Sequence, residues 1–160
     1  MSTDARPAVV AFDGSDEARA AVNAAVTLFP GRKLVIVSVW EPGLAVALAP
    51  TRDLTGVSYP PPTTEEVQAL DRVQENHAVE MADAGAALAR ELGATAEPAP
   101  IPDEAHVADT VAAEAERVDA CAIVVGSRGL GGVRSRLFGS TSRELLRRSG
   151  RPVLVVKAPG

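Results

Sequence analysis

Cysteine and aromatic residues are scarce in this chain of 160 residues. Cys121 is the only cysteine, so no disulfide can form within one chain. It stands in the apolar run 120–125, which is typical of a small buried hydrophobic residue rather than of a reactive thiol. Aromatic residues make up 3% of the composition and apolar residues 46%, so the core has to be built from Ala, Val, Leu and Ile.

Long hydrophobic runs are also missing. No stretch approaches the roughly 20 apolar residues that a membrane-spanning helix needs. Residues 1–6 are polar and lack the apolar segment of a signal peptide. We therefore expect a cytoplasmic protein without a membrane partner, and the net charge of −5 argues against a nucleic-acid partner. The length is that of one domain, so residues 1–160 are expected to form a single unit.

Charge is unevenly distributed along the chain. Residues 126–160 contain eight Lys or Arg and one acid, Glu144, so this segment carries +7 while residues 1–125 carry −12. Such asymmetry points to an anion site near the C-terminal end. For any single arginine, a solvated basic helix face is an equal alternative.

Four short runs are rich in β-branched residues and nearly continuous in apolarity: 7–12, 33–40, 121–125 and 152–157. Continuous apolarity indicates strands that are covered on both faces, as in a parallel sheet. A fifth, weaker strand is expected at 95–101. Pro98 and Pro100 would remove ladder donors there, so this strand should lie at an edge of the sheet.

Helical patterns fill the gaps at 15–28, 64–92, 104–118 and 141–149. Ser15 is a suitable N-cap for the first of these helices and Asp103 for the third. Thr141 and Glu144 have the spacing of a capping box at the start of the last helix.

The long second helix carries an apolar stripe at spacings of three and four, which is expected to face the core. Its members are Leu70, Val73, His77, Met81, Ala84, Leu88 and Leu92. His77 is therefore predicted to be a packed side chain rather than a catalytic one. Gly93 follows the stripe and is a suitable helix terminator.

Strands and helices thus alternate, which predicts an α/β domain with right-handed crossovers and a doubly wound sheet. Ligands of such sheets bind beyond the carboxyl ends of the strands. The segment 41–62 contains five prolines and leaves the carboxyl end of the second strand. A loop of this length is usually functional or mobile, so it either folds over a bound ligand or is simply disordered.

The most glycine-rich segment starts at Gly126 and reads GSRGLGGVRSRLFGSTS. Gly126 and Gly129 allow positive φ angles and leave no Cβ to keep an anion away, so that successive N–H groups can line an anion nest. Gly139 leads into a helix whose free N–H groups and dipole also favour anions. The hydroxyl groups of residues 140–142 add donors, and Arg128 adds positive charge. The segment predicts phosphate binding, with an ordinary glycine-rich turn as the alternative.

Other nucleotide motifs are absent. No Gly-Lys-Ser or Gly-Lys-Thr occurs, which excludes a Walker A loop. The first strand–helix turn reads Phe12-Asp13-Gly14-Ser15, which does not match the dinucleotide pattern Gly-x-Gly-x-x-Gly. An acid at this turn, here Asp13, can act as an N-cap, as a metal ligand or as a contact to a bound ligand. Ser15 can itself cap the helix, which weakens the N-cap alternative for Asp13.

The spacing Gly126-x2-Gly129-x9-Gly139-Ser140 resembles the ATP-binding pattern of the universal stress protein family. The resemblance covers the whole chain, including the turn after the first strand, the run VVGSRG and the ending RPVLVV. It implies a five-stranded parallel sheet of order 3-2-1-4-5, with helices on both faces, of the adenine nucleotide alpha hydrolase-like type.

The resemblance also implies a site for ATP, with Mg²⁺ arriving on the nucleotide. The Ala11 backbone and Asp13 would contact the adenosine, and Val39 would line the adenine pocket. The ribose and phosphates would be held by Gly126, Ser127, Arg128 and Gly129, and the phosphate tail by Gly139, Ser140, Thr141 and Ser142. The bulky Phe12 beside Asp13 departs from the family pattern and bears on the pocket floor if it faces that way. Members commonly form homodimers through the last strand, here Val153–Val156.

Little in the sequence suits fast catalysis. Neither His77 nor His106 lies beside a nucleophile and an acid in the order of a catalytic triad, and no His/Cys cluster has metal-ligand spacing. We expect a nucleotide-dependent stress-response or regulatory switch, with a slow ATPase or nucleotide-handling enzyme of the same architecture as the alternative. An ATP-pyrophosphatase would need a longer glycine-serine loop after the first strand. A receiver domain would need a phosphorylatable aspartate after the third strand, and residues 98–102 provide no acid before Asp103.

Overall fold

The computed structural model describes residues 6–43, 46, 60–103, 105–129 and 139–159. The strands are β1 (Ala8–Ala11), β2 (Leu34–Trp40), β3 (Ala96–Pro102), β4 (Ala122–Gly126) and β5 (Val153–Val156). The helices are α1 (Asp16–Leu28), α3 (Thr64–Glu91), α4 (Val107–Arg117) and α5 (Ser140–Arg148). All strand pairs are parallel and the order is β3-β2-β1-β4-β5, which confirms the predicted fold. Most of the predicted loop 41–62 lies outside the described residues.

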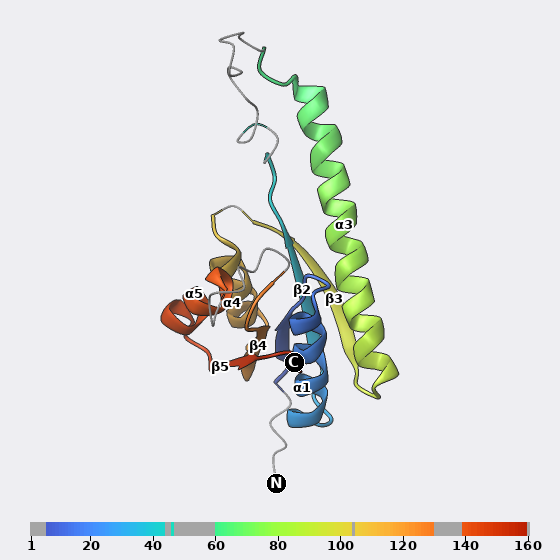
Figure 1. The fold of residues 1–160 in the computed structure, drawn as a ribbon, viewed down its shortest axis with the longest axis vertical. Coiled ribbons are helices and arrows are strands. Elements are labelled where there is room, and N and C mark those ends of the chain that lie inside the picture. Colours follow the sequence, from blue (N-terminus) through green and yellow to red (C-terminus); the bar gives the residue numbers. More distant parts are fainter. Residues whose placement is uncertain (1–5, 44–45, 47–59, 104, 130–138, 160) are drawn as a thin grey trace.

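Each face of the sheet is covered by a pair of helices (Figure 1). Alternate strand residues such as Val10, Ile36 and Val124 pack with α1 and α3 in one buried cluster. Their neighbours, such as Val9 and Val37, pack with α4 and α5 in a second cluster. Residues of both registers are therefore buried, which is why the strands read as continuous apolar runs.

Three prolines close the β3 edge of the sheet to further strands. The Leu34 N–H donates to Thr95 O (2.8 Å) and the Asp103 N–H donates to Trp40 O (2.7 Å), so odd-numbered residues of this stretch face β2. Backbone groups alternate in direction along a strand, so the even-numbered Pro98, Pro100 and Pro102 face outward. Proline has no N–H, so the outward side of β3 lacks these ladder donors.

The opposite edge, β5, keeps its donors. Pro152 O accepts from the Ile123 N–H (2.8 Å) and Val156 O accepts from the Ser127 N–H (2.6 Å), so the even-numbered residues face β4. Val153 and Val155 consequently direct their backbone N–H and C=O groups away from the sheet. β5 is the strand through which the family resemblance implies dimerisation. It is also the edge strand whose outward N–H and C=O groups can pair with another strand.

The core-facing stripe of α3 differs from the predicted one. Its buried residues are Ala78, Ala82, Gly85, Ala86 and Ala89. Leu70 and Val73, predicted to be buried, are 42% and 62% exposed, and His77 is also exposed, so the prediction of a packed histidine is wrong. The helix packs against the sheet through small residues, and its amino-terminal half extends past the body of the domain (Figure 1).

Phe12 explains why small residues are needed there. Its side chain is buried in the cluster formed with α1 and α3. A Cβ at Gly85 would lie 2.9 Å from Phe12 Cγ and 2.7 Å from Ile36 Cγ2, so α3 approaches the sheet more closely than any larger side chain allows. Phe12 therefore faces away from α4 and α5.

Two predicted helix starts are wrong in detail. The N-cap of α4 is His106, without a side-chain cap bond, whereas Asp103 accepts from the Ala105 N–H (3.0 Å) and Thr110 Oγ1 (2.7 Å). The N-cap of α5 is Gly139, and Glu144 pairs with arginines of its own helix instead of closing a capping box. Short polar side chains near both starts favoured a cap two or three residues from the real one.

Cys121 is half-buried against the α1/α3 cluster, less enclosed than predicted. Among the described residues, no helix is both long enough and apolar enough to cross a membrane.

Candidate functional site

The first strand–helix turn places Asp13 at the carboxyl edge of the sheet. Asp13 Oδ1 accepts from the Ser15 N–H (3.0 Å) and from Ser15 Oγ (2.6 Å). Ser15 Oγ in turn accepts from the Ala18 N–H (3.2 Å), which makes Ser15 the N-cap of α1, as predicted. One oxygen of Asp13 is therefore occupied in orienting the cap serine.

The base of the glycine loop is held by three elements. The Ser127 N–H donates to Val156 O in β5 (2.6 Å), and Ser127 O accepts from the Gly139 N–H (2.6 Å). The Ser142 hydroxyl of α5 lies within hydrogen-bond distance of Ser127 O (3.3 Å) and Gly139 O (3.2 Å). The two halves of the predicted motif are thus brought together, with Ser127 at the junction.

The three motif glycines have different surroundings. A Cβ at Gly126 would lie 2.7 Å from Glu17 Cβ and 2.8 Å from the Glu17 carbonyl carbon, so this glycine lets α1 pack on the end of β4. A Cβ at Gly129 would lie 2.5 Å from Asp13 Oδ2, so this glycine brings the loop against the β1 turn. Among the described residues, the nearest atoms to a Cβ at Gly139 would be Arg128 Cα and Ser127 O, both at 3.5 Å.

The start of α5 has no side-chain cap among the described residues. Gly139 has φ −68° and ψ 169°, a conformation that any residue adopts, and no side chain caps the helix. The first N–H groups of a helix have no partner within the helix. The Ser127 hydroxyl nearby is fully buried and has no hydrogen-bond partner among the described residues. Donors without partners therefore gather where the motif predicts phosphate.

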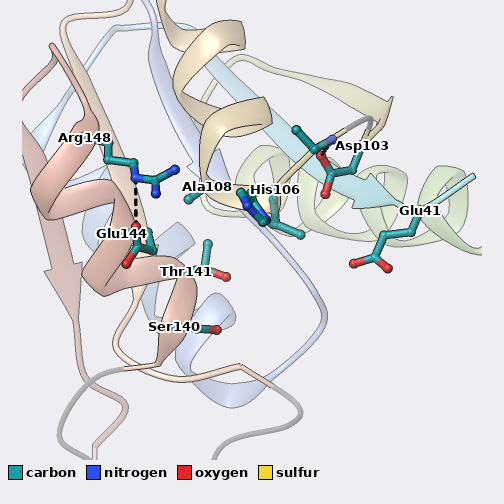
Figure 2. A pocket seen from close by; sticks show the side chains of 10 residues that line it. Glu41, Asp103, His106, Ala108, Ser140, Thr141, Glu144 and Arg148 are labelled. Atoms are coloured by element: carbon teal, nitrogen blue, oxygen red, sulfur yellow. Dashed lines mark hydrogen bonds and ion pairs between the residues drawn. The ribbon is translucent and has the colours of Figure 1, made fainter. Parts of the chain in front are cut away.

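A pocket of about 430 Å³ opens beside this helix start. It is lined by Glu41, Asp103, Ala105, His106, Val107, Ala108, Ser140, Thr141, Glu144 and Arg148. Figure 2 shows these side chains around the pocket, with Ser140 and Thr141 from α5 on one side and Glu41 and Asp103 on another. The pocket thus joins the starts of α4 and α5 to the carboxyl ends of β2 and β3.

The pocket lining carries more acids than available cations. Arg148 lies between Asp109 (Nη1 to Oδ2, 3.0 Å) and Glu144 (Nε to Oε2, 2.9 Å). The contact with Glu144 has the distance but not the angles of a hydrogen bond, so we regard it as a charge contact. Asp103 is buried and Glu41 is exposed at the pocket rim.

The remaining predicted residues are placed as follows. Ala11 and Val39 are half-buried and pack with the α4/α5 cluster, on the pocket side of the sheet. Arg128 Nη2 lies 3.1 Å from Glu17 Oε1, so its side chain is directed to α1. In the parts of the chain that are described, no group of three or more His, Cys, Asp or Glu could hold a metal ion.

Sequence reasoning missed Glu41, Asp103, His106, Glu144 and Arg148 as pocket residues. Glu41 and Asp103 directly follow β2 and β3, just as Asp13 follows β1, so the rule that placed Asp13 would have found them. His106 was assigned to a helix start but not to this edge. Glu144 and Arg148 are four residues apart on α5, so they share one face of the helix, and both line the pocket.

Fold and site together define a doubly wound α/β domain with a candidate ligand site at the carboxyl edge of its sheet. The model of the universal stress protein family matches residues 5–157, and the chain belongs to this family. Its sequence is 30% identical over 149 residues to the universal stress protein YxiE of Bacillus subtilis, covering 93% of this chain and 97% of YxiE.

Solved structures share the fold. The hypothetical protein MJ0577 is similar with a TM-score of 0.76 at 16% identity, covering 99% of both chains. The universal stress protein of Archaeoglobus fulgidus, solved in complex with dAMP, gives 0.63 at 24% identity, covering 95% of this chain and 98% of that one. An Arabidopsis thaliana family protein with AMP bound gives 0.64 at 16% identity, covering 97% and 93%.

Proposed function

We propose that this chain binds an adenine nucleotide, ATP with its Mg²⁺, at the carboxyl edge of the sheet and acts as a nucleotide-dependent switch in stress response or regulation. The observation that carries the proposal is the start of α5, which no side chain of the described residues caps, beside the buried Ser127 hydroxyl, which has no hydrogen-bond partner among those residues. Helix N-termini and buried donors of this kind suit a phosphate group. In the similar Archaeoglobus and Arabidopsis structures, the bound molecules are adenine nucleotides.

Gly139 supports this interpretation in particular. Its φ angle does not require glycine, and among the described residues no atom lies close enough to exclude a side chain there. Serine, asparagine or aspartate would cap the helix better than glycine does. A glycine that the fold does not need, at a helix start that lacks a cap, is explained if a ligand takes the space and the N–H groups.

The pocket beside this start suits the rest of the nucleotide. Ala11 and Val39 would meet the adenosine from the sheet, with Asp13 at its side, as the family resemblance implies. The phosphates would be bound by Ser127, Gly129, Ser140, Thr141 and Ser142. Gly126 would contribute indirectly, because it allows α1 to pack on the end of β4. The acids Glu41 and Glu144 at the pocket disfavour a bare triphosphate, so we expect Mg²⁺ to enter with ATP.

We prefer a switch to an enzyme because, among the described residues that line the pocket, no nucleophile is paired with a base. His106 is the only histidine among these residues, and no hydrogen bond joins it to a serine or cysteine of the described chain. We further propose that the protein acts in the cytoplasm as a homodimer joined through Val153–Val156, the edge that retains its pairing groups.

Isothermal titration of the purified protein with ATP and Mg²⁺ tests the proposal. We expect binding at micromolar concentrations, and mass spectrometry should find an adenine nucleotide released when freshly purified protein is denatured. No heat and no thermal shift at millimolar ATP would contradict it. Steady-state hydrolysis near the usual enzyme median of about 10 s⁻¹ would contradict the switch.

A further inference from the structure

Arg128 lies inside the glycine motif, but its side chain is not directed to the pocket beside α5. Its Nη2 atom lies 3.1 Å from Glu17 Oε1 in the first turn of α1. The Arg128 side chain is 35% exposed and that of Glu17 15%, so the pair is partly shielded from water. A partly shielded pair between a loop and a helix restricts the loop more than an exposed pair does.

Glu17 is itself held in place. Its backbone carbon would lie 2.8 Å from a Cβ at Gly126, so the first turn of α1 rests directly on the end of β4. Ser15 caps the same turn, and Asp13 orients that serine. The carboxylate that meets Arg128 therefore projects from a fixed backbone.

The backbone of Arg128 adjoins the phosphate end of the candidate site. A Cβ at Gly139 would lie 3.5 Å from both Arg128 Cα and Ser127 O. The Gly139 N–H donates to Ser127 O, one residue before Arg128. Whatever fixes Arg128 therefore also fixes the position of Gly139 and the start of α5.

We propose that Glu17 and Arg128 are positioning residues that anchor the base of the glycine loop to α1, and that the Arg128 side chain does not bind phosphate. Arg128 then serves the nucleotide through its backbone alone. This inference rests on the proposed function for its effect on binding, but the anchoring itself is measurable without a ligand.

Glu17→Gln, Arg128→Gln and the double variant test the anchor by titration with AMP and with ATP. Each single variant should lower the affinity for AMP and the affinity for ATP by the same factor, roughly three- to tenfold. The double variant should bind nucleotide no more weakly than either single variant, because each single substitution already breaks the ion pair. Arg128→Lys keeps a cation within reach of Glu17 and should restore most of the affinity.

Asp16→Asn is the matched control, since it removes a neighbouring acid of the same helix turn, one that forms no ion pair with Arg128 in the described part of the chain. It should bind both nucleotides like the unaltered protein. A phosphate-binding Arg128 predicts a different result: Arg128→Gln would weaken ATP much more than AMP, and Glu17→Gln would leave both unchanged or tighten ATP. That pattern would overturn the proposal.

Amide hydrogen exchange supplies the readout that needs no nucleotide. The Ser127 and Gly139 amides are bonded in this structure, and their exchange should accelerate in Glu17→Gln and Arg128→Gln but not in Asp16→Asn. Unchanged exchange at both amides would refute the anchor whether or not the protein binds nucleotide. Failure of the unaltered protein to bind ATP and AMP would refute the proposed function instead.

Discussion

Gly139 offers a direct test at the scale of single residues. Its backbone is in the ordinary N-cap conformation, so Gly139→Ser should supply the missing cap and stabilise the unliganded protein. N-cap serines contribute about 1 kcal/mol or less over glycine, which corresponds to a rise in Tm of a few degrees. The same hydroxyl occupies the helix donors and space that phosphate needs, so nucleotide affinity should fall roughly tenfold. Thermal unfolding and titration measure the two effects.

Gly126→Ala is the informative contrast. Here the added methyl would press on the Glu17 backbone at 2.8 Å, which cannot yield without moving α1. Overpacking of this kind costs about 1–3 kcal/mol, so Tm should fall by roughly 5 °C. If Gly139→Ser bound nucleotide as tightly as the unaltered protein, the start of α5 would not be the phosphate site.

Arg151 gives a second prediction at this scale, concerning pH. Its guanidinium donates to Asp119 Oδ1 and Glu116 Oε2, both at 2.6 Å, and ties the start of β5 to the end of α4. The hydrogen bond from Arg151 lowers the pKa of Glu116 below its ordinary value of 4.5. A lowered folded-state pKa stabilises the protein above the unfolded pKa, and this contribution is lost as pH falls through the folded value.

Arg151→Gln should therefore lower Tm at pH 7, while the gap to the unaltered protein narrows as pH falls below about 4.5. Thermal unfolding across pH 3–7 measures this. Arg147→Gln is the control, because its ion pair with Glu144 lies within one exposed helix. A gap for Arg151→Gln that stayed constant down to pH 3 would show that the Glu116 carboxylate does not carry the effect.

At the scale of elements, periodicity located the five strands and the helices α1, α3, α4 and α5 but misjudged one helix face. The stripe predicted for α3 followed the large apolar residues, such as Leu70 and Val73, whereas the buried stripe consists of alanines and Gly85. Large side chains dominate any hydrophobicity pattern, but the aromatic ring of Phe12 already fills the space under this helix. Which face of α3 is buried depends on the shape of the sheet surface against which the helix packs. The sequence pattern of the helix alone does not contain that shape.

Two substitutions in α3 test which face packs. Gly85→Val should destabilise the protein by about 1–3 kcal/mol, because its Cβ would lie 2.7 Å from Ile36 and 2.9 Å from Phe12. Val73→Ala removes a side chain that is 62% exposed and should change stability by no more than about 0.5 kcal/mol. Urea unfolding measures both. A loss above about 2 kcal/mol for Val73→Ala would restore the stripe predicted from the sequence.

At the scale of the whole molecule, strand–helix alternation predicted the doubly wound sheet, which the structure confirms, whereas the ligand site that the glycine spacing predicts at the end of β4 stays a prediction. The neighbours Glu41, Asp103 and Arg148 were not predicted, because their meeting depends on how α4 and α5 sit relative to β2 and β3. The pairing of Arg128 with Glu17 was missed for the same reason. Sequence motifs identify the residues around a phosphate, whereas the partners that hold those residues come from distant segments.

The two edges of the sheet predict how copies of the chain assemble. The outward positions of β3 hold Pro98, Pro100 and Pro102, whereas those of β5 hold Val153 and Val155 with their N–H groups. Sheet extension through β5 therefore joins two copies and leaves only proline edges outside, so growth should stop at the proposed dimer. Light scattering behind size-exclusion chromatography should find this dimer in the unaltered protein.

Val155→Pro removes an N–H that faces away from β4, so it should yield a folded monomer with an unchanged far-ultraviolet circular dichroism spectrum. Val155→Ala keeps the N–H and should remain a dimer, which separates loss of the donor from loss of the side chain. Leu154→Pro faces β4 and should instead destabilise the sheet itself. If the Val155→Pro protein stayed dimeric, the contact between the two copies would lie elsewhere in the molecule. The variant is decisive because it removes an N–H donor on the outward side of β5 and leaves the hydrogen bonds between β4 and β5 intact.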